Sequence, residues 1–207
     1  MINNRIRNII FDLGGVLIDW NPRYLYRKLF RTEAAVEYFL QNITTFPWNE
    51  EQDAGRPLHI ATQILIDRFP EYSPEIDAYY GKWEEDMLGD AHDNMVQLLR
   101  EFIENPSYRV YALTNWSAET FPVARRKFPF LSWFEGIVVS GEEKVKKPDP
   151  AIYHILLKRF DLITNECLFI DDSVKNVSGA KRVGLHAIHF QNVDQLKNDL
   201  IPFGIVQ

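Results

Sequence analysis

The sequence predicts an α/β fold in which a parallel sheet is covered by helices on both faces. Five short apolar runs are typical of strands, and the later ones alternate with segments whose apolar residues recur at helical spacing. These runs are too continuously apolar to leave one sheet face in water, which favours a parallel sheet. About ninety residues separate the first two runs, and they show helical patterns but no convincing strand.

Each element can be placed by its residue range. The expected strands are 8–13, 108–114, 136–140, 167–171 and 186–190. The helices expected around the later strands are 91–104, 117–127, 149–160 and 173–183. Within the long gap, helical spacing recurs at 22–41, 57–69 and 74–88. Because a structureless loop of that length is improbable in a compact domain, we expect an all-helical module inserted after the first strand.

The composition restricts the class of function. The chain has 207 residues, 46% of them hydrophobic, which is enough for one core and a small inserted module. Its formal net charge of −6 is spread without a strong basic cluster, so we expect neither a nucleic-acid nor a membrane partner. The amino-terminal apolar stretch is too short for a signal peptide, and no run approaches the ~20 residues of a membrane helix. We expect a cytoplasmic protein that acts on a small molecule.

Polar side chains stand at the carboxyl ends of the expected strands, the edge at which open α/β sheets bind ligands. In chain order they are Asp12, Thr114 with Asn115, Lys147, and Asp171 with Asp172. Taken singly, most have an ordinary explanation as a helix cap, a turn former or a solvated charge. The adjacent carboxylates of the last pair are harder to explain, because they repel each other unless a cation or a donor compensates.

In this order, the four segments resemble the signature motifs of the haloacid dehalogenase (HAD) superfamily of hydrolases. FDLGGVL is similar to its nucleophile motif, LTN to its second motif, KPDPAIY to its lysine motif and FIDDSVKNVSGAKRVGLHAI to its acidic motif. The resemblance implies a Rossmann-like core of residues 1–15 and 91–207 and a helical cap of residues 16–90. Within that cap, PWNEEQDAGR resembles the phosphatase-like branch that includes sugar-1-phosphate phosphatases and the N-terminal phosphatase of epoxide hydrolases.

The resemblance implies a phosphatase for a small phosphorylated metabolite, such as a sugar phosphate. Asp12 would be the nucleophile that forms an aspartyl-phosphate, and Lys147 would neutralise both that carboxylate and the phosphoryl group. Thr114 and the backbone N–H of Asn115 would hold phosphate oxygens. Trp116 would form part of the substrate wall.

The same resemblance implies a magnesium site. Magnesium is a hard cation that prefers oxygen ligands. The expected ligands are Asp12, the backbone carbonyl of Gly14, Asp172 and, either directly or through water, Asp171. Asn176 would support the acidic loop without binding the metal.

Gly14 departs from the pattern of the family. Most phosphatases of the superfamily carry a second aspartate two residues after the nucleophile, which protonates the leaving oxygen and later activates water. Without it, the protein either acts on esters with acidic leaving groups, uses water or a cap residue instead, or does not transfer phosphoryl groups. Asp19 is a poor substitute, because Asp19-Trp20-Asn21-Pro22 is typical of a helix start.

Three residues of the expected cap have both a functional and a structural interpretation. Trp48, Asp53 and Arg56 either line the pocket, or Trp48 belongs to the cap core and residues 53–55 form a turn.

Two other functions stay open at this point. The first is a metal-independent L-2-haloacid dehalogenase, which LTNWSAETF resembles, although a metal-free site has little use for Asp171 beside Asp172. The second is a non-catalytic protein of the same fold that binds a phosphorylated metabolite or a protein partner. Neither the substrate nor an oligomeric state follows from the sequence.

Overall fold

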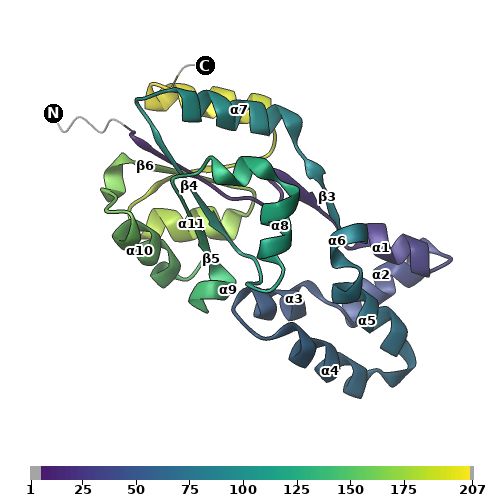
Figure 1. Cartoon of the computed structure of the whole chain (residues 1–207). Coiled ribbons are helices and arrows are strands. Elements are labelled where there is room, and N and C mark those ends of the chain that lie inside the picture. Colours follow the sequence, from purple (N-terminus) through teal and green to yellow (C-terminus); the bar gives the residue numbers. More distant parts are fainter. Residues whose placement is uncertain (1–5, 206–207) are drawn as a thin grey trace.

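A parallel sheet of five strands forms the centre of the computed structural model, which describes residues 6–205 (Figure 1). Its strands are β1 (Asn8–Phe11), β4 (Arg109–Thr114), β5 (Gly136–Val139), β6 (Cys167–Asp171) and β7 (His186–His189). The order across the sheet is β5-β4-β1-β6-β7, and every neighbouring pair is parallel. The five expected strands are therefore confirmed, with β1 in the middle.

Helices cover both faces of the sheet (Figure 1). One face packs against α7 (Asp93–Glu104), α8 (Phe121–Lys127) and α12 (Val193–Leu200). The opposite face packs against α10 (Pro150–Arg159) and α11 (Val174–Arg182). The short helix α9 (Ser140–Glu143) follows β5, and four 3-10 turns lie at Pro70–Tyr72, Pro129–Ser132, Thr164–Glu166 and Ile201–Phe203.

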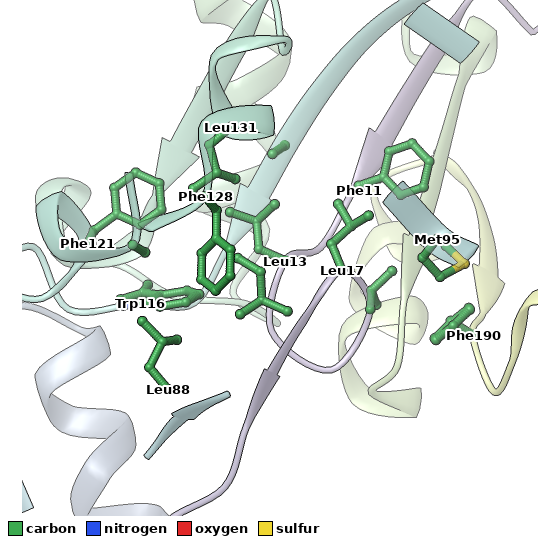
Figure 2. Packing of buried hydrophobic residues seen from close by; sticks show 14 of the residues in the cluster. Phe11, Leu13, Leu17, Leu88, Met95, Trp116, Phe121, Phe128, Leu131 and Phe190 are labelled. Atoms are coloured by element: carbon green, nitrogen blue, oxygen red, sulfur yellow. The ribbon is translucent and has the colours of Figure 1, made fainter. Parts of the chain in front are cut away.

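The side chains of β1 supply both layers of the core. Ile9 and Phe11 join the hydrophobic cluster beneath α7, whereas Ile10 joins the cluster beneath α10 and α11. This alternation follows from the two-residue period of a strand, and it explains why the run reads as continuously apolar. Figure 2 shows the first cluster extending from Phe11 past Leu13 to Trp116 and Leu88.

Six α-helices are inserted between β2 (Ile18–Trp20) and β3 (Leu88–Ala91). They are α1 (Arg23–Leu29), α2 (Glu33–Asn42), α3 (Phe46–Asp53), α4 (Leu58–Arg68), α5 (Ser73–Gly81) and α6 (Trp83–Asp86). We call residues 23–86 the helical module. The chain enters it through β2 and leaves it through β3, and these two strands pair antiparallel. Figure 1 shows the module beside the sheet, with α3 next to α9.

The structure corrects three expectations for this insertion. It contains the strands β2 and β3, where no strand was expected. The single helix expected at 22–41 is two helices, because Phe30 is extended and Thr32 caps α2 by accepting a hydrogen bond from Ala35 N. Helix α3 was not expected, since Phe46–Asp53 lacks a periodic apolar face. Its start signal was present: Thr45 caps it and a proline lies in its first turn.

Three contacts hold the helical module against the rest of the protein. Lys146 Nζ lies 2.9 Å from Glu50 Oε2 of α3, and Leu58 N donates to Glu119 Oε1 at 2.9 Å. The rings of Trp83 and Trp116 meet edge to face, with centroids 5.9 Å apart. Helix α3 is therefore fixed over the carboxyl edge of the sheet. No helix within residues 6–205 is long and apolar enough to cross a membrane.

Candidate active site

Asp12 follows β1 at the centre of the sheet edge. Its backbone N–H continues the ladder to β6 by donating to Ile170 O at 2.8 Å. Its side chain is largely buried, and Oδ1 accepts a hydrogen bond from Leu13 N at 2.7 Å. From β1 the chain first adds β4 and β5 on one side of the sheet and then β6 and β7 on the other. Asp12 therefore lies at the point where the strand order reverses, which is where open α/β sheets bind their ligands.

Lys147 reaches Asp12 from the protein interior. Its side chain is fully buried, and its Nζ lies 2.9 Å from Asp12 Oδ1, 2.7 Å from Asp171 Oδ2 and 2.8 Å from Leu113 O. Since an ammonium group has three N–H donors, these three acceptors use them all. Lys147 therefore joins the end of β1 to the end of β6.

Asn115 holds the lysine loop. Its side-chain oxygen accepts from Lys147 N at 2.8 Å, and its side-chain nitrogen donates to Lys147 O at 3.0 Å. Sequence reasoning placed Asn115 among the phosphate-binding residues and missed this second task. The paired bonds position Lys147 by fixing its backbone from the end of β4.

Asp171 is surrounded by donors. It is fully buried, accepts from Lys147 Nζ and from Ser173 N, and receives Asn176 Nδ2 at 3.1 Å on each carboxylate oxygen. Asn176 is itself tied down, because its backbone carbonyl accepts the Tyr153 hydroxyl at 2.8 Å. The neighbouring Asp172 is exposed and lines a cavity.

Three carboxylates meet at this point. Asp12, Asp171 and Asp172 each place an oxygen so that all three oxygens lie within 4.8 Å of one another. With one ammonium among them, the four side chains carry two negative charges in excess when ionised, which a divalent cation would balance. Carboxylate oxygens are also the ligands that magnesium prefers, so the donor set fits that ion.

The pKa values show the same excess of negative charge. Burial raises the pKa of Asp12 well above its usual value, and Asp171 and Asp172 raise it further, while Lys147 opposes them. Burial by itself would lower the pKa of Lys147, but the attraction of Asp12 and Asp171 outweighs burial and raises it. Burial and then Asp171 also raise the pKa of Asp172. A bound cation would lower the carboxyl pKa values.

Thr114 ends β4 with an unpartnered hydroxyl. Its Oγ1 is one of two buried side-chain oxygens in residues 6–205 without a hydrogen-bond partner, and the other, on Thr44, lies in the helical module. A buried hydroxyl without a partner costs free energy, which a ligand that reached Thr114 would recover. Thr114 does not line the cavity, whereas Asn115 and Trp116 do.

The two glycines after Asp12 differ in what they permit. Gly15 has φ +74°, and a Cβ there would clash with the Asp172 carboxylate. A Cβ at Gly14 would meet nothing within 4 Å. Gly15 is thus required by the backbone and by Asp172, whereas Gly14 leaves open space.

A cavity of about 540 Å³ opens over this edge. Its floor includes Asp12, Gly14 and Asp172. Aromatic side chains contribute to its walls, namely Trp20, Phe46, Trp83 and Trp116. Glu50 and Asp53 reach it from α3, and Lys175 from α11. The helical module therefore supplies much of the wall around the carboxylate cluster.

The structure separates the three cap candidates. Asp53 lines the cavity as the last residue of α3, and the turn begins one residue later than expected, at Ala54. Trp48 packs against Tyr79 and donates to Ala61 O, so it belongs to the core of the helical module. Arg56 donates to Gln52 Oε1 and Trp48 O.

Asp19, the side chain considered as a substitute acid, lies elsewhere. Its Oδ2 accepts the Tyr24 hydroxyl at 2.7 Å, and it is not a wall residue of the cavity. It is in β2 and not at a helix start, because α1 begins four residues later at Arg23.

The fold and the site together define an α/β protein with a carboxylate and lysine cluster at a topological switch point. A family model described as haloacid dehalogenase-like hydrolase matches residues 6–184. This chain belongs to that family. The sequence motifs predicted this membership.

Two curated relatives are phosphatases. The chain is 29% identical to the sesquiterpene phosphatase astK of Aspergillus oryzae, over 87% of each protein. It is 35% identical to the glyceraldehyde 3-phosphate phosphatase of Pyrococcus abyssi, over 90% of this chain and 82% of that protein. The chain is therefore a HAD-family hydrolase with phosphatases among its relatives.

Solved structures share this fold, and one of them comes from a bacterial enzyme. It is that of a HAD family enzyme from Bacteroides thetaiotaomicron in complex with magnesium and inorganic phosphate, with a TM-score of 0.67 and 24% identity. The match covers 92% of this chain and 98% of the other.

The glycine pair gives a testable prediction. Replacing Gly15 by alanine should lower the free energy of unfolding by more than about 1 kcal/mol, because the left-handed backbone and the Asp172 carboxylate both oppose a Cβ. Gly14→Ala is the matched control and should stay within about 0.5 kcal/mol of the natural protein. Urea unfolding followed by circular dichroism measures both. Equal stabilities of the two variants would contradict this reading of the loop.

Proposed function

We propose that this protein is a magnesium-dependent phosphatase that hydrolyses a small phosphorylated metabolite through an aspartyl-phosphate on Asp12. The observation that carries the proposal is the buried Lys147 ammonium, held between Asp12 and Asp171 beside a third carboxylate. Such a cluster combines a nucleophile with a charge that stabilises it and with ligands for a divalent cation.

The nucleophile is available for attack from the cavity. Asp12 lines the cavity floor, and one of its oxygens is engaged by Leu13 N and Lys147 Nζ. The lone pairs of its other oxygen would attack phosphorus, the bond from phosphorus to the leaving oxygen would break, and the phosphoryl group would pass to Asp12. Water would then attack the same phosphorus and release phosphate and the Asp12 carboxylate.

Two side chains would stabilise the phosphoryl group. The unpartnered Thr114 hydroxyl is a donor at the end of β4, and the Lys147 charge lies beside Asp12. Donors fixed before the reaction stabilise developing charge more than mobile water does. Asp12, Asp172, the carbonyl of Gly14 and Asp171, directly or through water, would hold Mg²⁺. When bound, this ion supplies positive charge to the phosphate oxygens.

We propose that the helical module is the cap of this enzyme, with domain boundaries at residues 16 and 90. The aromatic walls at Trp20, Phe46, Trp83 and Trp116 would pack against the carbon face of the leaving group. A sugar ring offers such a face together with hydroxyl groups for Glu50 or Asn49, so a sugar phosphate is one candidate. The two relatives, a sesquiterpene phosphatase and a glyceraldehyde 3-phosphate phosphatase, support phosphate esters of small organic molecules as substrates.

The dehalogenase alternative is less well supported. Attack on carbon leaves no task for the exposed Asp172 carboxylate beside Asp171, whereas magnesium binding gives it one. The non-catalytic alternative does not explain why Lys147 and Asp12 form a buried ion pair at the cavity. A cytoplasmic location remains our proposal.

The nucleophile can be tested by one substitution. Asp12→Asn keeps the size of the side chain but removes its charge and nucleophilicity, so hydrolysis of phosphate esters should fall by at least about a thousandfold. A screen of sugar phosphates, nucleotides and acyl phosphates, with and without magnesium, identifies the substrate for this comparison. If Asp12→Asn retained substantial turnover, the covalent mechanism would be wrong.

The metal can be tested by direct binding. Titration with MgCl₂ in a calorimeter should show one site in the natural protein and none in Asp172→Ala, which should keep the circular dichroism spectrum of the fold. Activity should disappear in excess EDTA and return with added magnesium. Full hydrolysis in excess EDTA would contradict the magnesium requirement and favour the metal-independent dehalogenase.

A further inference from the structure

The proposed mechanism requires a proton for the leaving oxygen, and the nucleophile loop does not supply it. Gly14 stands where the acid of related enzymes is expected, and it has no side chain. The space beside it is open, since a Cβ there would meet nothing within 4 Å. Residues of α3 line the same cavity as Gly14, so a donor from that helix would face the leaving group across the cavity.

The cavity offers four carboxyl groups in the described part of the chain, on Asp12, Glu50, Asp53 and Asp172. Asp12 and Asp172 belong to the nucleophile and metal cluster. Glu50 forms an ion pair with Lys146 at 2.9 Å. This leaves Asp53 as the carboxyl group without an assigned task.

The local structure fixes Asp53 at the edge of the sheet. It is the last residue of α3, which packs against α9 and is anchored by the ion pair between Glu50 and Lys146. The turn after it fits closely, because a Cβ at Gly55 would lie 3.0 Å from Lys144 Cγ and 3.3 Å from Gly141 O. Asp53 also receives a backbone hydrogen bond from Ser117, two residues after Asn115.

The surroundings of Asp53 suit a group that both gives and takes a proton near neutral pH. Burial raises its pKa to about 7, opposed by Lys146 and Lys147 and reinforced by Glu50. Its position at the carboxyl end of a helix also disfavours the charged form. The other titratable groups that face it are the buried hydroxyls of Tyr79 and Tyr80 in α5, whose own pKa values lie above 10.

We infer that Asp53, carried by the helical module, is the general acid and base that replaces the side chain missing at Gly14. This inference rests on the proposed function. As Asp12 attacks and the bond from phosphorus to the leaving oxygen breaks, the Asp53 carboxyl proton passes to that oxygen, giving an alcohol and the Asp53 carboxylate. The carboxylate then accepts a proton from the water that attacks the phosphoryl-Asp12 phosphorus, which restores the carboxyl group.

The test uses a primary alkyl phosphate and an aryl phosphate, because an aryl leaving group departs without a proton. Asp53→Asn, which is nearly isosteric, should lower the rate with the alkyl ester by about a hundred- to ten-thousandfold and the formation of phosphoryl-Asp12 from the aryl ester far less. The natural enzyme should lose activity on the alkyl ester as the pH rises through about 7, where Asp53 loses its proton, and Asp53→Asn should lack this decline.

Two further variants make the test specific. Gly14→Asp, added to Asp53→Asn, should restore much of the alkyl activity, because the open space at Gly14 accommodates a carboxyl group beside the nucleophile. Asp77→Asn is the matched control, since it makes the same change at an exposed position of α5 and should leave rates and pH profile unchanged.

The outcomes separate the two claims. An Asp53→Asn enzyme with natural alkyl activity and pH profile would overturn the role of Asp53, and so would an equal loss with both esters that Gly14→Asp does not restore. If the natural protein instead hydrolysed neither ester in the presence of magnesium, the proposed function itself would fail.

Discussion

The arrangement of this site depends on one buried ammonium group. Lys147 has no contact with water and satisfies its three donors with Asp12, Asp171 and a carbonyl of β4. Removing one partner of such a buried pair costs about 3–5 kcal/mol, because the other charge is left without compensation. The parallel sheet makes the arrangement possible, since it brings the ends of β1, β4 and β6 side by side, and Asn115 and Asn176 then fix the lysine and the acidic loop.

The helical module completes what the sheet edge lacks. The sheet edge supplies the charged cluster around Asp12 but no side chain at Gly14, whereas the module supplies Phe46, Trp83 and Asp53 to the cavity wall. Helix α3 meets the sheet edge through the partly exposed ion pair between Glu50 and Lys146, and its Trp48 belongs to the same hydrophobic cluster as Phe11 of β1. An acid carried on such an element would act only when the module rests over the substrate, which would join substrate enclosure to proton transfer.

The sequence predicted the elements that have strong local signals. The strands have apolar centres, and Asp12, Lys147 and Asp171 lie at or beyond the carboxyl ends of strands, where the structure brings them together. Helix α3 could not be found from periodicity, because only Trp48 and Gln52 are buried, one of them polar, and its apolar Phe46 is exposed. The pairing of β2 with β3 could not be predicted from the sequence either, because strands this short are recognised only by the partner to which they hydrogen-bond. The hydrogen bonds of Asn115 to Lys147 and the packing of Trp48 in the core of the helical module depend on residues distant in the chain. A local sequence pattern therefore does not predict them.

The central claim is that Asp12 receives the phosphoryl group. Rapid acid quenching of the natural enzyme during turnover, followed by peptide mass spectrometry, tests it most directly, because acyl phosphates survive acid long enough to be located. The account predicts one added phosphoryl group on the peptide that contains Asp12, which disappears on treatment with hydroxylamine. A phosphoryl group on another residue, or turnover with no phosphorylated peptide at any quench time, would contradict it.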